Sequence, residues 1–251
     1  MKFLDVKIDN HIKYAFHALA LDEQRAPYSP TIWEKPESCT TELKQVWFPG
    51  VHSNVGGSYD DTGMADISLA WMMSNLKQWI DFKPGYLERL FHLNQKYNAS
   101  QNPPLLRGWG LGRLYNSCTF PQSIAGQQPR TPHIYHRMNY FTGKEVPDLL
   151  KNTNETMHAS VRARLRMGGK GYEDKGAYAP QPLMKEWVLD NGEQRSDAGA
   201  TISASNKTAK WVYNGNNPNA KGKVILEEPL GDLELELLRL DPTAAAEVLG
   251  S

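Results

Sequence analysis

Cysteine, net charge and long apolar runs are all scarce in this sequence of 251 residues. Its two cysteines, Cys39 and Cys118, stand far apart and outside any C-x-x-C pair, which argues against a zinc or redox motif. They could form one disulfide, but two free thiols in a reducing compartment are the better interpretation. The 28 basic and 28 acidic residues cancel, so bulk charge predicts neither a nucleic-acid nor a membrane-surface partner.

Segments that would place the protein in or across a membrane are also missing. No stretch approaches the roughly 20 consecutive apolar residues that a membrane-spanning helix needs. The N-terminus, "MKFLDVKIDNHIKYAF", lacks the apolar core and the cleavage site of a signal peptide. Hydrophobic residues still make up 40% of the chain, which is enough to bury a core. We therefore expect a soluble, cytoplasmic protein.

Several motifs that would reveal a reaction are absent too. No G-x-S-x-G occurs, so the sequence offers no serine on a nucleophile elbow. The glycines of "GWGLG" (108–112) follow no strand and do not form a dinucleotide fingerprint. Asp60, Asp61 and Asp66 fit no EF-hand loop, and a solvated turn that caps a helix explains them better. His158 is expected to pack in a helix rather than to act as a second active-site histidine. We expect no cofactor and no metal.

The pattern of apolar residues that is present predicts an α/β protein. The run 43–51 is apolar almost throughout and rich in β-formers, which is typical of a strand buried on both faces. The run 11–23 alternates like a strand but also carries a helical stripe, and the proline-rich loop after it favours the strand. The run 64–82 is apolar on nearly every face, as in a helix that covers a sheet. The other expected elements are helices at 85–97, 154–165 and 230–250, an irregular excursion at 102–147, and a strand-turn-strand unit at 209–228.

Two of the expected strands end in groups that can move protons. The strand at 43–51 runs into "GVHSNVGG", where His52 stands among glycines that permit sharp turns. Ligands of open α/β sheets bind at the carboxyl ends of strands, and imidazole transfers protons well near neutral pH. The preceding run ends in Asp22 and Glu23, so an acid precedes the histidine as in α/β-hydrolases. Plainer interpretations stay open: His52 bonds to a loop carbonyl, and Asp22 caps a helix or pairs with Arg25.

Three blocks of the sequence together resemble a known family. "HALALDEQRAPYSPTIW", "LKQVWFPGVHSNVGGSY" and "ADISLAWMM" are similar to an uncharacterised α/β-hydrolase-like domain of many fungal proteins. The same domain is the catalytic part of type VI secretion phospholipase effectors. "YNSCTF", "NETMHASVRAR" and "GDLELELL" resemble the downstream part of the fungal members. The likeness implies a partial α/β-hydrolase-like sheet with covering helices at 1–100, followed at 101–251 by an irregular, partly helical extension with a late hairpin.

The resemblance also implies a chemistry, the serine-dependent hydrolysis of a carboxylic or phospholipid ester. His52 would be the general base and Asp22 its orienting acid, with Glu23 as the substitute. The family's nucleophile block, of the form G-F-S-R-G, is absent, Asn54 stands where many members have Asp, and Ser58 where many have Gly. The likeness covers only the C-terminal part of the family's domain, so we expect no activity from this chain alone.

Two hypotheses follow for the function. In the first, the chain is the C-terminal portion of a hydrolase that acts on a lipid or another ester. In the second, it is a non-catalytic binding or interaction module that reuses half of a hydrolase sheet, with the excursion at 102–147 as its contact surface. Half a sheet also exposes an unpaired strand edge, through which the chain could associate.

Overall fold

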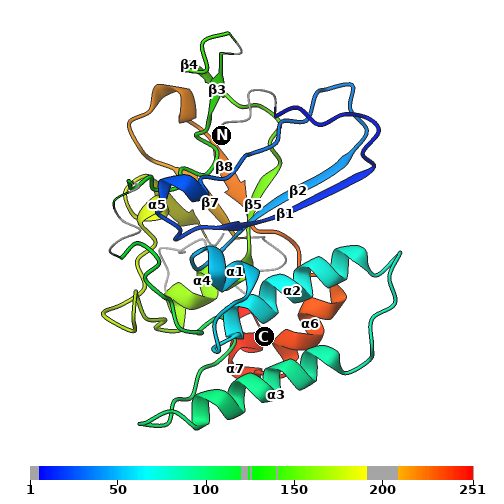
Figure 1. The fold of residues 1–251 in the computed structure, drawn as a ribbon, viewed down its shortest axis with the longest axis vertical. Helices are drawn as coiled ribbons and strands as arrows, with labels where there is room; N and C mark the ends of the chain where they lie inside the picture. The colour runs from blue at the N-terminus through cyan, green and yellow to red at the C-terminus, as the bar shows by residue number, and fades with distance from the viewer. Residues whose placement is uncertain (1–5, 120–123, 125, 140, 191–208, 251) are drawn as a thin grey trace, which may run out of the picture.

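The computed structural model describes residues 6–119, 124, 126–139, 141–190 and 209–250. At its centre lies a parallel sheet of three strands in the order β1-β2-β5 (Figure 1). These strands are β1 (Tyr14–Ala20), β2 (Glu42–Phe48) and β5 (Glu155–Met157). The strands expected at 11–23 and 43–51 are thereby confirmed, each somewhat shorter than the sequence pattern indicated.

Strand β2 carries the core of the sheet on both of its faces. Trp47 belongs to one hydrophobic cluster, whereas Val46 and Phe48 belong to another. All three side chains are at most 1% exposed. Because successive side chains of a strand point to opposite faces, an unbroken apolar run requires that both faces be covered. The interpretation of 43–51 as a strand buried on both faces is confirmed.

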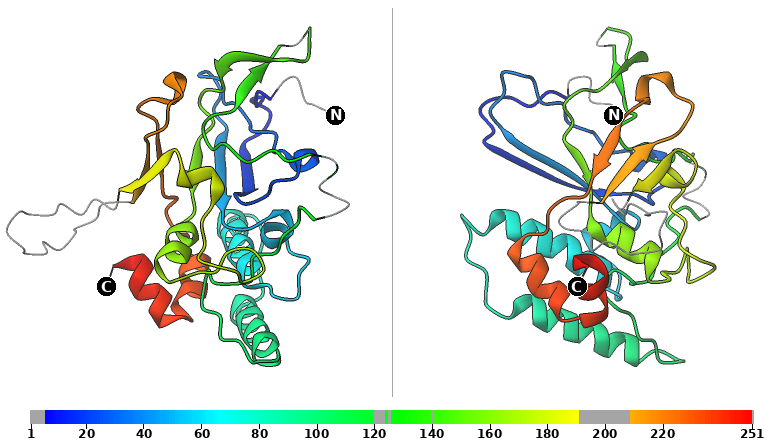
Figure 2. Two further views of the ribbon diagram at one scale, coloured as in Figure 1. Left: turned by 90° about the vertical axis from the view of Figure 1, so that its left-hand side faces the viewer. Right: turned by 180° about the vertical axis from the view of Figure 1, so that it is seen from behind.

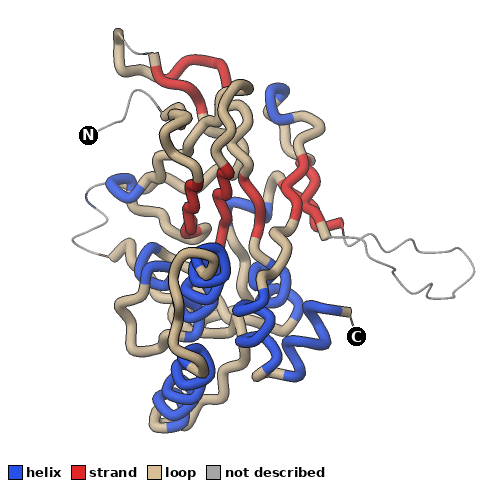
Figure 3. Tube along the Cα trace, turned by 90° about the vertical axis from the view of Figure 1, so that its right-hand side faces the viewer, coloured by secondary structure: helices blue, strands red, loops and turns tan. Residues whose placement is uncertain are grey.

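Helices cover the Val46 face of the sheet and extend away from it. Figure 3 shows the strands, in red, gathered above most of the helices, in blue. Trp71, in the middle of α2, packs edge-on against Phe48, at 5.6 Å between ring centroids. The helices on this side are α1 (His52–Gly56), α2 (Gly63–Leu76), α3 (Tyr86–Ala99), α6 (Asp232–Arg239) and α7 (Pro242–Leu249).

Two of the expected helices are wrong in extent. The helix predicted at 64–82 ends at Leu76, because Trp79 and Ile80 beyond it are about half exposed and offer no buried face to stabilise further turns. The helix predicted at 230–250 divides before Pro242, which cannot donate a helical hydrogen bond. The Asp241 side chain there caps the start of α7, accepting from two backbone N–H groups at 3.1 Å.

The helix predicted at 154–165 is wrong over its first residues. Glu155–Met157 form β5, which pairs with β2, and helix α4 (Ala159–Arg166) starts only after His158. Pairing with a central strand buries Met157 completely, and this tertiary gain overrides the helical pattern of the segment. Strand β5 lies beyond residue 101, so the central sheet draws on both segments into which the sequence was divided.

A second, antiparallel sheet covers the Trp47 face of the parallel one. It contains β6 (Trp187–Asp190), β7 (Lys210–Tyr213) and β8 (Val224–Leu226), in that order. Figure 2 shows it in yellow and orange beside the parallel sheet. Trp211 and Ile225 join the same hydrophobic cluster as Trp47. The strand-turn-strand unit expected at 209–228 is confirmed as β7 and β8.

The excursion expected at 102–147 falls partly outside the described residues. Its described part contains β3 (His136–Met138) and the start of β4 (Glu145–Leu149), which pair as a hairpin. A short helix, α5 (Gln181–Met184), precedes β6. The described residues thus form a mixed α/β structure with small sheets and no barrel.

Two further expectations concern the cysteines and the membrane. Cys39 and Cys118 are both free, and Cys39 is buried. Among the residues described, none of the helices combines the length and the apolar character that a bilayer crossing requires.

Candidate functional site

The carboxyl ends of β1 and β2 meet at one edge of the parallel sheet, where the sequence placed its site residues. The two segments stay side by side beyond the strands: the Leu21 N–H donates to the Phe48 carbonyl at 3.0 Å. One step on, the Asp22 N–H donates to the Gly50 carbonyl, also at 3.0 Å. His52 follows directly and begins α1. Because parallel strands end at the same edge, the fold brings the acidic segment and the histidine loop together.

The Asp22 carboxylate holds the backbone of the histidine loop. Its Oδ2 accepts hydrogen bonds from the Gly50 N–H at 2.6 Å and from the Tyr178 hydroxyl at 2.9 Å. Asp22 is 3% exposed, and this burial raises the pKa of its carboxyl group against the opposing effect of both hydrogen bonds. Gly50 has a φ of +112°, and a Cβ there would lie 2.5 Å from the Asn54 Cβ, so the turn requires glycine.

Glu23 binds the same loop and also forms an ion pair with Arg25. Its Oε2 accepts from the His52 N–H at 3.0 Å, and its two oxygens accept from the Arg25 side chain at 2.9 and 2.8 Å. Burial alone raises the pKa of Glu23, but the hydrogen bonds from Arg25 and from the His52 backbone, with the Arg25 charge, lower it to about 2. Arg25 thus pairs with Glu23, where the sequence had left open a pair with Asp22.

Ser117 is a polar neighbour that sequence analysis did not single out. Its hydroxyl lies 3.1 and 3.2 Å from the two oxygens of Glu23. Tyr178 was missed in the same way, although its hydroxyl bonds Asp22. Both residues are far from the site in sequence and lie in irregular segments, so no periodicity or spacing could have indicated them.

The His52 imidazole is exposed at this edge. Its backbone N–H, rather than its ring, donates to Glu23. The ring packs at a tilt against Tyr28, at 5.0 Å between centroids, and Tyr28 in turn lies under the Arg25 guanidinium at 3.7 Å. The Asp22 carboxylate accepts from the Gly50 N–H and from the Tyr178 hydroxyl. A hydrogen bond from the imidazole to Asp22, which would orient the ring, therefore stays a prediction.

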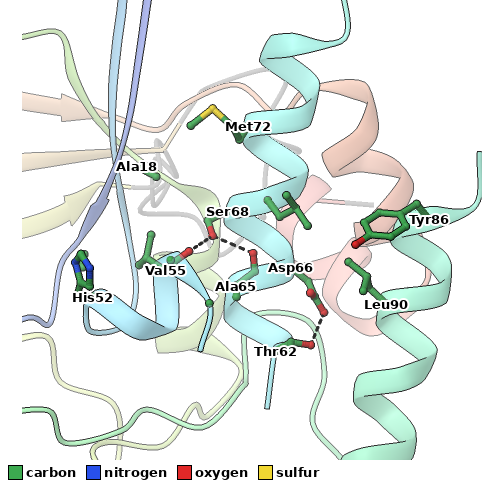
Figure 4. A pocket seen from close by; sticks show the side chains of 14 residues that line it. Ala18, His52, Val55, Thr62, Ala65, Asp66, Ser68, Met72, Tyr86 and Leu90 are labelled. Carbon is green, nitrogen blue, oxygen red and sulfur yellow. Dashed lines mark hydrogen bonds between the residues drawn. The ribbon is translucent and has the colours of Figure 1, made fainter. Parts of the chain in front are cut away.

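An apolar cleft of about 490 Å³ lies beside His52 (Figure 4). A volume of this order is typical of pockets for small molecules. Removing hydrocarbon from water is favourable, so the cleft suits an acyl or alkyl group. Strand β1 and helices α1, α2 and α3 supply its apolar lining, which consists of Ala18, Ala20, Val55, Ala65, Leu69, Met72, Tyr86 and Leu90.

Acidic residues at the start of α2 serve the helix and the neighbouring loops. The Thr62 hydroxyl donates to Asp66 at 2.8 Å, and Asp61 accepts from the Gly63 and Arg113 N–H groups at 3.2 and 2.8 Å. Asp66 lines the cleft, and its burial, together with the Asp61 charge, raises its pKa to about 6 despite the bond from Thr62. Within the described ranges, no group of three or more His, Cys, Asp or Glu side chains could hold a metal ion.

His158 lies at the carboxyl end of β5 and is completely buried. Its Nδ1 accepts from the Ser160 N–H at 3.1 Å, which caps α4, so its Nε2 carries the proton that bonds Glu234 at 2.8 Å. The ring stacks on Phe48 at 4.5 Å between centroids. These contacts tie α4, α6 and β2 together and give His158 a structural role without solvent access.

We expect acid to loosen the histidine loop through Glu23. The pKa of Glu23 is about 2 in the folded protein and 4.5 in the unfolded chain. Its stabilising effect is therefore complete above about pH 5 and is lost as the pH falls towards 2, in total about 3 kcal/mol. Between those pH values, the free energy of unfolding should therefore fall by about that amount less in Glu23→Gln than in the unaltered protein. Urea unfolding at several pH values measures the difference. The exposed Glu37→Gln is the control, and an equal change in both variants would contradict the assignment.

The segment that holds Asp22, Glu23 and His52 is similar to a phospholipase family. Residues 1–75 match the family model described as T6SS, phospholipase effector Tle1-like, catalytic domain. A search of curated proteins and a search of solved structures each found no match. The similarity supports a phospholipase-like or esterase-like origin for this part of the chain.

Proposed function

We propose that this chain supplies the histidine base and the acyl-binding cleft of a serine-type ester hydrolase, and that the nucleophilic serine lies in a segment outside this sequence. The observation that carries the proposal is the exposed His52 imidazole beside an apolar cleft of about 490 Å³, at the carboxyl end of a parallel strand. The match of residues 1–75 to a phospholipase catalytic domain supports a lipid ester as the substrate.

In this role His52 works as the base of a serine hydrolase. The imidazole takes the proton of the serine hydroxyl as that oxygen attacks the ester carbonyl, and it returns the proton to the departing alcohol. It then takes a proton from the water that attacks the acyl group, and it gives this proton to the serine oxygen as the acid product leaves. An exposed ring can meet a serine that another segment brings within hydrogen-bond reach. The cleft holds the acyl chain, with about 0.8 kcal/mol for each buried methylene group.

The two carboxylates have a positioning role in this proposal. Asp22 and Glu23 bind the N–H groups of Gly50 and His52, and so position the backbone from which the imidazole projects. Glu23 stays ionised over the whole neutral range because its pKa is about 2. The Glu23 carboxylate thus holds the His52 N–H by a charge-assisted hydrogen bond, which is stronger than a neutral one.

The variant Asp22→Asn distinguishes two roles of Asp22: positioning the backbone of the histidine loop, and orienting the imidazole ring directly. The amide oxygen of Asn can still accept from the Gly50 N–H, so a positioning role predicts a loss of activity below about tenfold. An acid that orients the imidazole predicts a loss of about 10⁴-fold when it becomes an amide. Both rates are measured in the protein that joins this chain to a serine-bearing segment, with the wild-type joined protein as reference.

The proposal as a whole is tested by restoring the nucleophile. The isolated chain should hydrolyse neither short-chain esters nor phospholipids. The same chain joined to the G-x-S-x-G segment of a Tle1-like catalytic domain should hydrolyse at least one of them. A joined protein that folds and stays inactive on all of these substrates would overturn the proposal.

The alternative is a non-catalytic binding module, and the absence of G-x-S-x-G from all 251 residues favours it. A fluorophosphonate probe, which labels activated serines, tests the isolated chain directly. Labelling would exclude the binding module and would also show that the nucleophile lies within this sequence. No labelling of the isolated chain, with labelling of the joined protein, is the outcome that we expect.

A further inference from the structure

One carboxyl group lies inside the apolar cleft beside His52. Asp66 belongs to the first turn of α2, lines the cleft and is only 6% exposed. The Thr62 hydroxyl donates to its Oδ2 at 2.8 Å, and no other group among the described residues donates to this carboxyl. Buried polar atoms are normally hydrogen-bonded. The second oxygen of Asp66, Oδ1, is therefore available to a ligand that enters the cleft.

The part of the chain that the structure describes supplies no cation to Asp66. Burial raises the pKa of Asp66 to about 6, against the hydrogen bond from Thr62 and with a further contribution from the Asp61 charge. Asp61 has a counter-ion of its own, since its Oδ2 lies 3.1 Å from the Nε of Arg107. The start of a helix favours a carboxylate, yet burial outweighs this benefit at Asp66. Buried charges are usually paired, so Asp66 suits a cation that a ligand brings.

Asp66 and His52 lie on different sides of the cleft. Figure 4 shows His52 on α1 at one side and Asp66 on α2 towards the other, where Tyr86 and Leu90 reach from α3 towards α2. The rest of the lining is mostly hydrocarbon. A ligand that fills the cleft therefore meets an imidazole on one side and a carboxylate on the other.

The surroundings of Asp66 decide which kind of cation fits. A metal ion needs several ligands, and the described residues hold no group of three or more His, Cys, Asp or Glu side chains that could bind one. An alkylammonium group instead carries its charge on hydrocarbon, which the apolar lining removes from water favourably. The face of an aromatic ring also attracts such a group, and Tyr86 supplies a ring on this side of the cleft.

We propose that Asp66 determines the specificity of the cleft, by selecting ligands in which a hydrocarbon body carries a cationic amine. The apolar lining holds the body, and the Asp66 carboxylate pairs with the charge. The inference rests on the proposed function in one respect, that the ester cleaved beside His52 carries this amine on its acyl or its alcohol side. Binding of the cation itself needs no catalysis.

Calorimetric titration of the chain as it stands tests the binding. Three probes share a hexyl chain: hexyltrimethylammonium is cationic, hexanol is uncharged and hexanesulfonate is anionic. At about pH 7.5 the cation should bind roughly tenfold more tightly than hexanol, because opposite charges attract strongly where water is excluded, and the anion should bind most weakly. Asp66→Asn should lose this preference for the cation and keep its affinity for hexanol, because the amide oxygen can still accept from Thr62.

The matched control is Asp60→Asn, which removes an exposed acidic charge shortly before α2 and outside the cleft lining. This control should bind all three probes as the unaltered protein does, and thermal unfolding should show that both variants stay folded. Equal affinities of the unaltered protein for hexyltrimethylammonium and hexanol would overturn the proposal. Equal losses of cation binding in the two variants would do the same.

The pH dependence of binding is a readout that a purely structural role of Asp66 would not produce. Hexyltrimethylammonium keeps its charge at every pH, so its affinity should follow the ionisation of the carboxyl group. With a pKa of about 6, the affinity should be highest above about pH 7 and roughly fivefold lower at about pH 5. His52 and Tyr86 are the other titratable side chains of the lining, and Asp61 is the neighbouring charge. A pH dependence that persists in Asp66→Asn would come from one of these groups and would contradict the proposal.

The joined protein shows which side of the ester carries the amine. Butyrylcholine has the cation on its alcohol side, and the ethyl ester of γ-trimethylammoniobutyrate has it on its acyl side. Each is compared with the uncharged ester in which carbon replaces the nitrogen. One of the two charged esters should have a kcat/KM roughly tenfold above that of its uncharged counterpart, and Asp66→Asn should remove this preference.

Selection by Asp66 and catalysis can fail separately. If the joined protein hydrolyses charged and uncharged esters equally well, the assignment of a cationic substrate is wrong and the proposed function stands. If the chain binds the cation selectively through Asp66 while the joined protein hydrolyses nothing, the cation site stands and the proposed function is wrong.

Discussion

In a protein that joins this chain to a G-x-S-x-G serine, replacing His52 with alanine should lower ester hydrolysis by about 10²–10⁴-fold, the usual contribution of a general base. The expected loss lies in kcat, because the imidazole moves the proton in the reaction, whereas the apolar side chains of the cleft hold the acyl group. The measurement is kcat and KM on a short-chain ester that dissolves freely.

The fold should survive His52→Ala. The imidazole is exposed, and the hydrogen bond that anchors residue 52 comes from its backbone N–H to Glu23, which alanine retains. His11→Ala is the matched control, because its side chain is 99% exposed and lies outside the cleft lining. A joined protein that keeps most of its rate after His52→Ala would end the assignment of this residue as the base.

The largest effect on stability is expected from Arg164→Met. Arg164 is completely buried, and its guanidinium donates to the carbonyls of Gly110, Gly112 and Lys170 at 2.9, 2.7 and 2.6 Å. Methionine fills similar space but leaves these carbonyls without their donor. Buried polar groups that lose their partner are costly, so we expect the free energy of unfolding to fall by about 3–5 kcal/mol in urea titrations.

The same contacts explain the "GWGLG" segment. Two of its carbonyls, those of Gly110 and Gly112, serve as acceptors for Arg164, so the glycines hold a loop rather than a phosphate. The guanidinium also lies over the ring of Tyr178, at 5.0 Å, and the Tyr178 hydroxyl bonds Asp22. Loss of Arg164 should therefore also disturb the histidine loop.

Arg166→Met is the control for Arg164→Met. Arg166 lies on the same helix, but its side chain is 33% exposed and meets Glu247 at 3.2 Å near the surface. An exposed ion pair contributes little, so the expected loss is below about 1 kcal/mol. Similar losses in the two variants would show that the buried carbonyl contacts do not set the stability of this loop.

The fold was predictable where a local pattern and its tertiary surroundings agree. The apolar run around Trp47 could only be a strand with two covered faces, and the structure confirms it. The helix at 85–97 is confirmed as α3, because its amphipathic pattern matches the single face that it buries. The division before Pro242 was not predicted, although the proline and the capping Asp241 that mark the start of α7 are both in the sequence.

Other elements depended on distant partners. Glu155–Met157 form a strand only because β2 offers them an edge, and no feature of their own sequence requires it. The end of α2 at Leu76 similarly goes with the exposure of Trp79 and Ile80, which the apolar pattern of 64–82 does not reveal. Such pairings are long-range, and periodicity within a short window carries no information about them.

By itself the sequence placed an acidic pair and a histidine after two runs that their apolar patterns favour as strands. The tertiary structure decided that these strands are parallel neighbours, whose ends meet at one edge of the sheet. The tertiary structure alone decided what each group touches. It put the oxygens of Asp22 and Glu23 on backbone N–H groups, and it formed the cleft from β1, α2 and α3 beside His52. The physical reason is that hydrogen bonds and cavities depend on positions within a few tenths of an ångström, which only the packing of the whole chain sets.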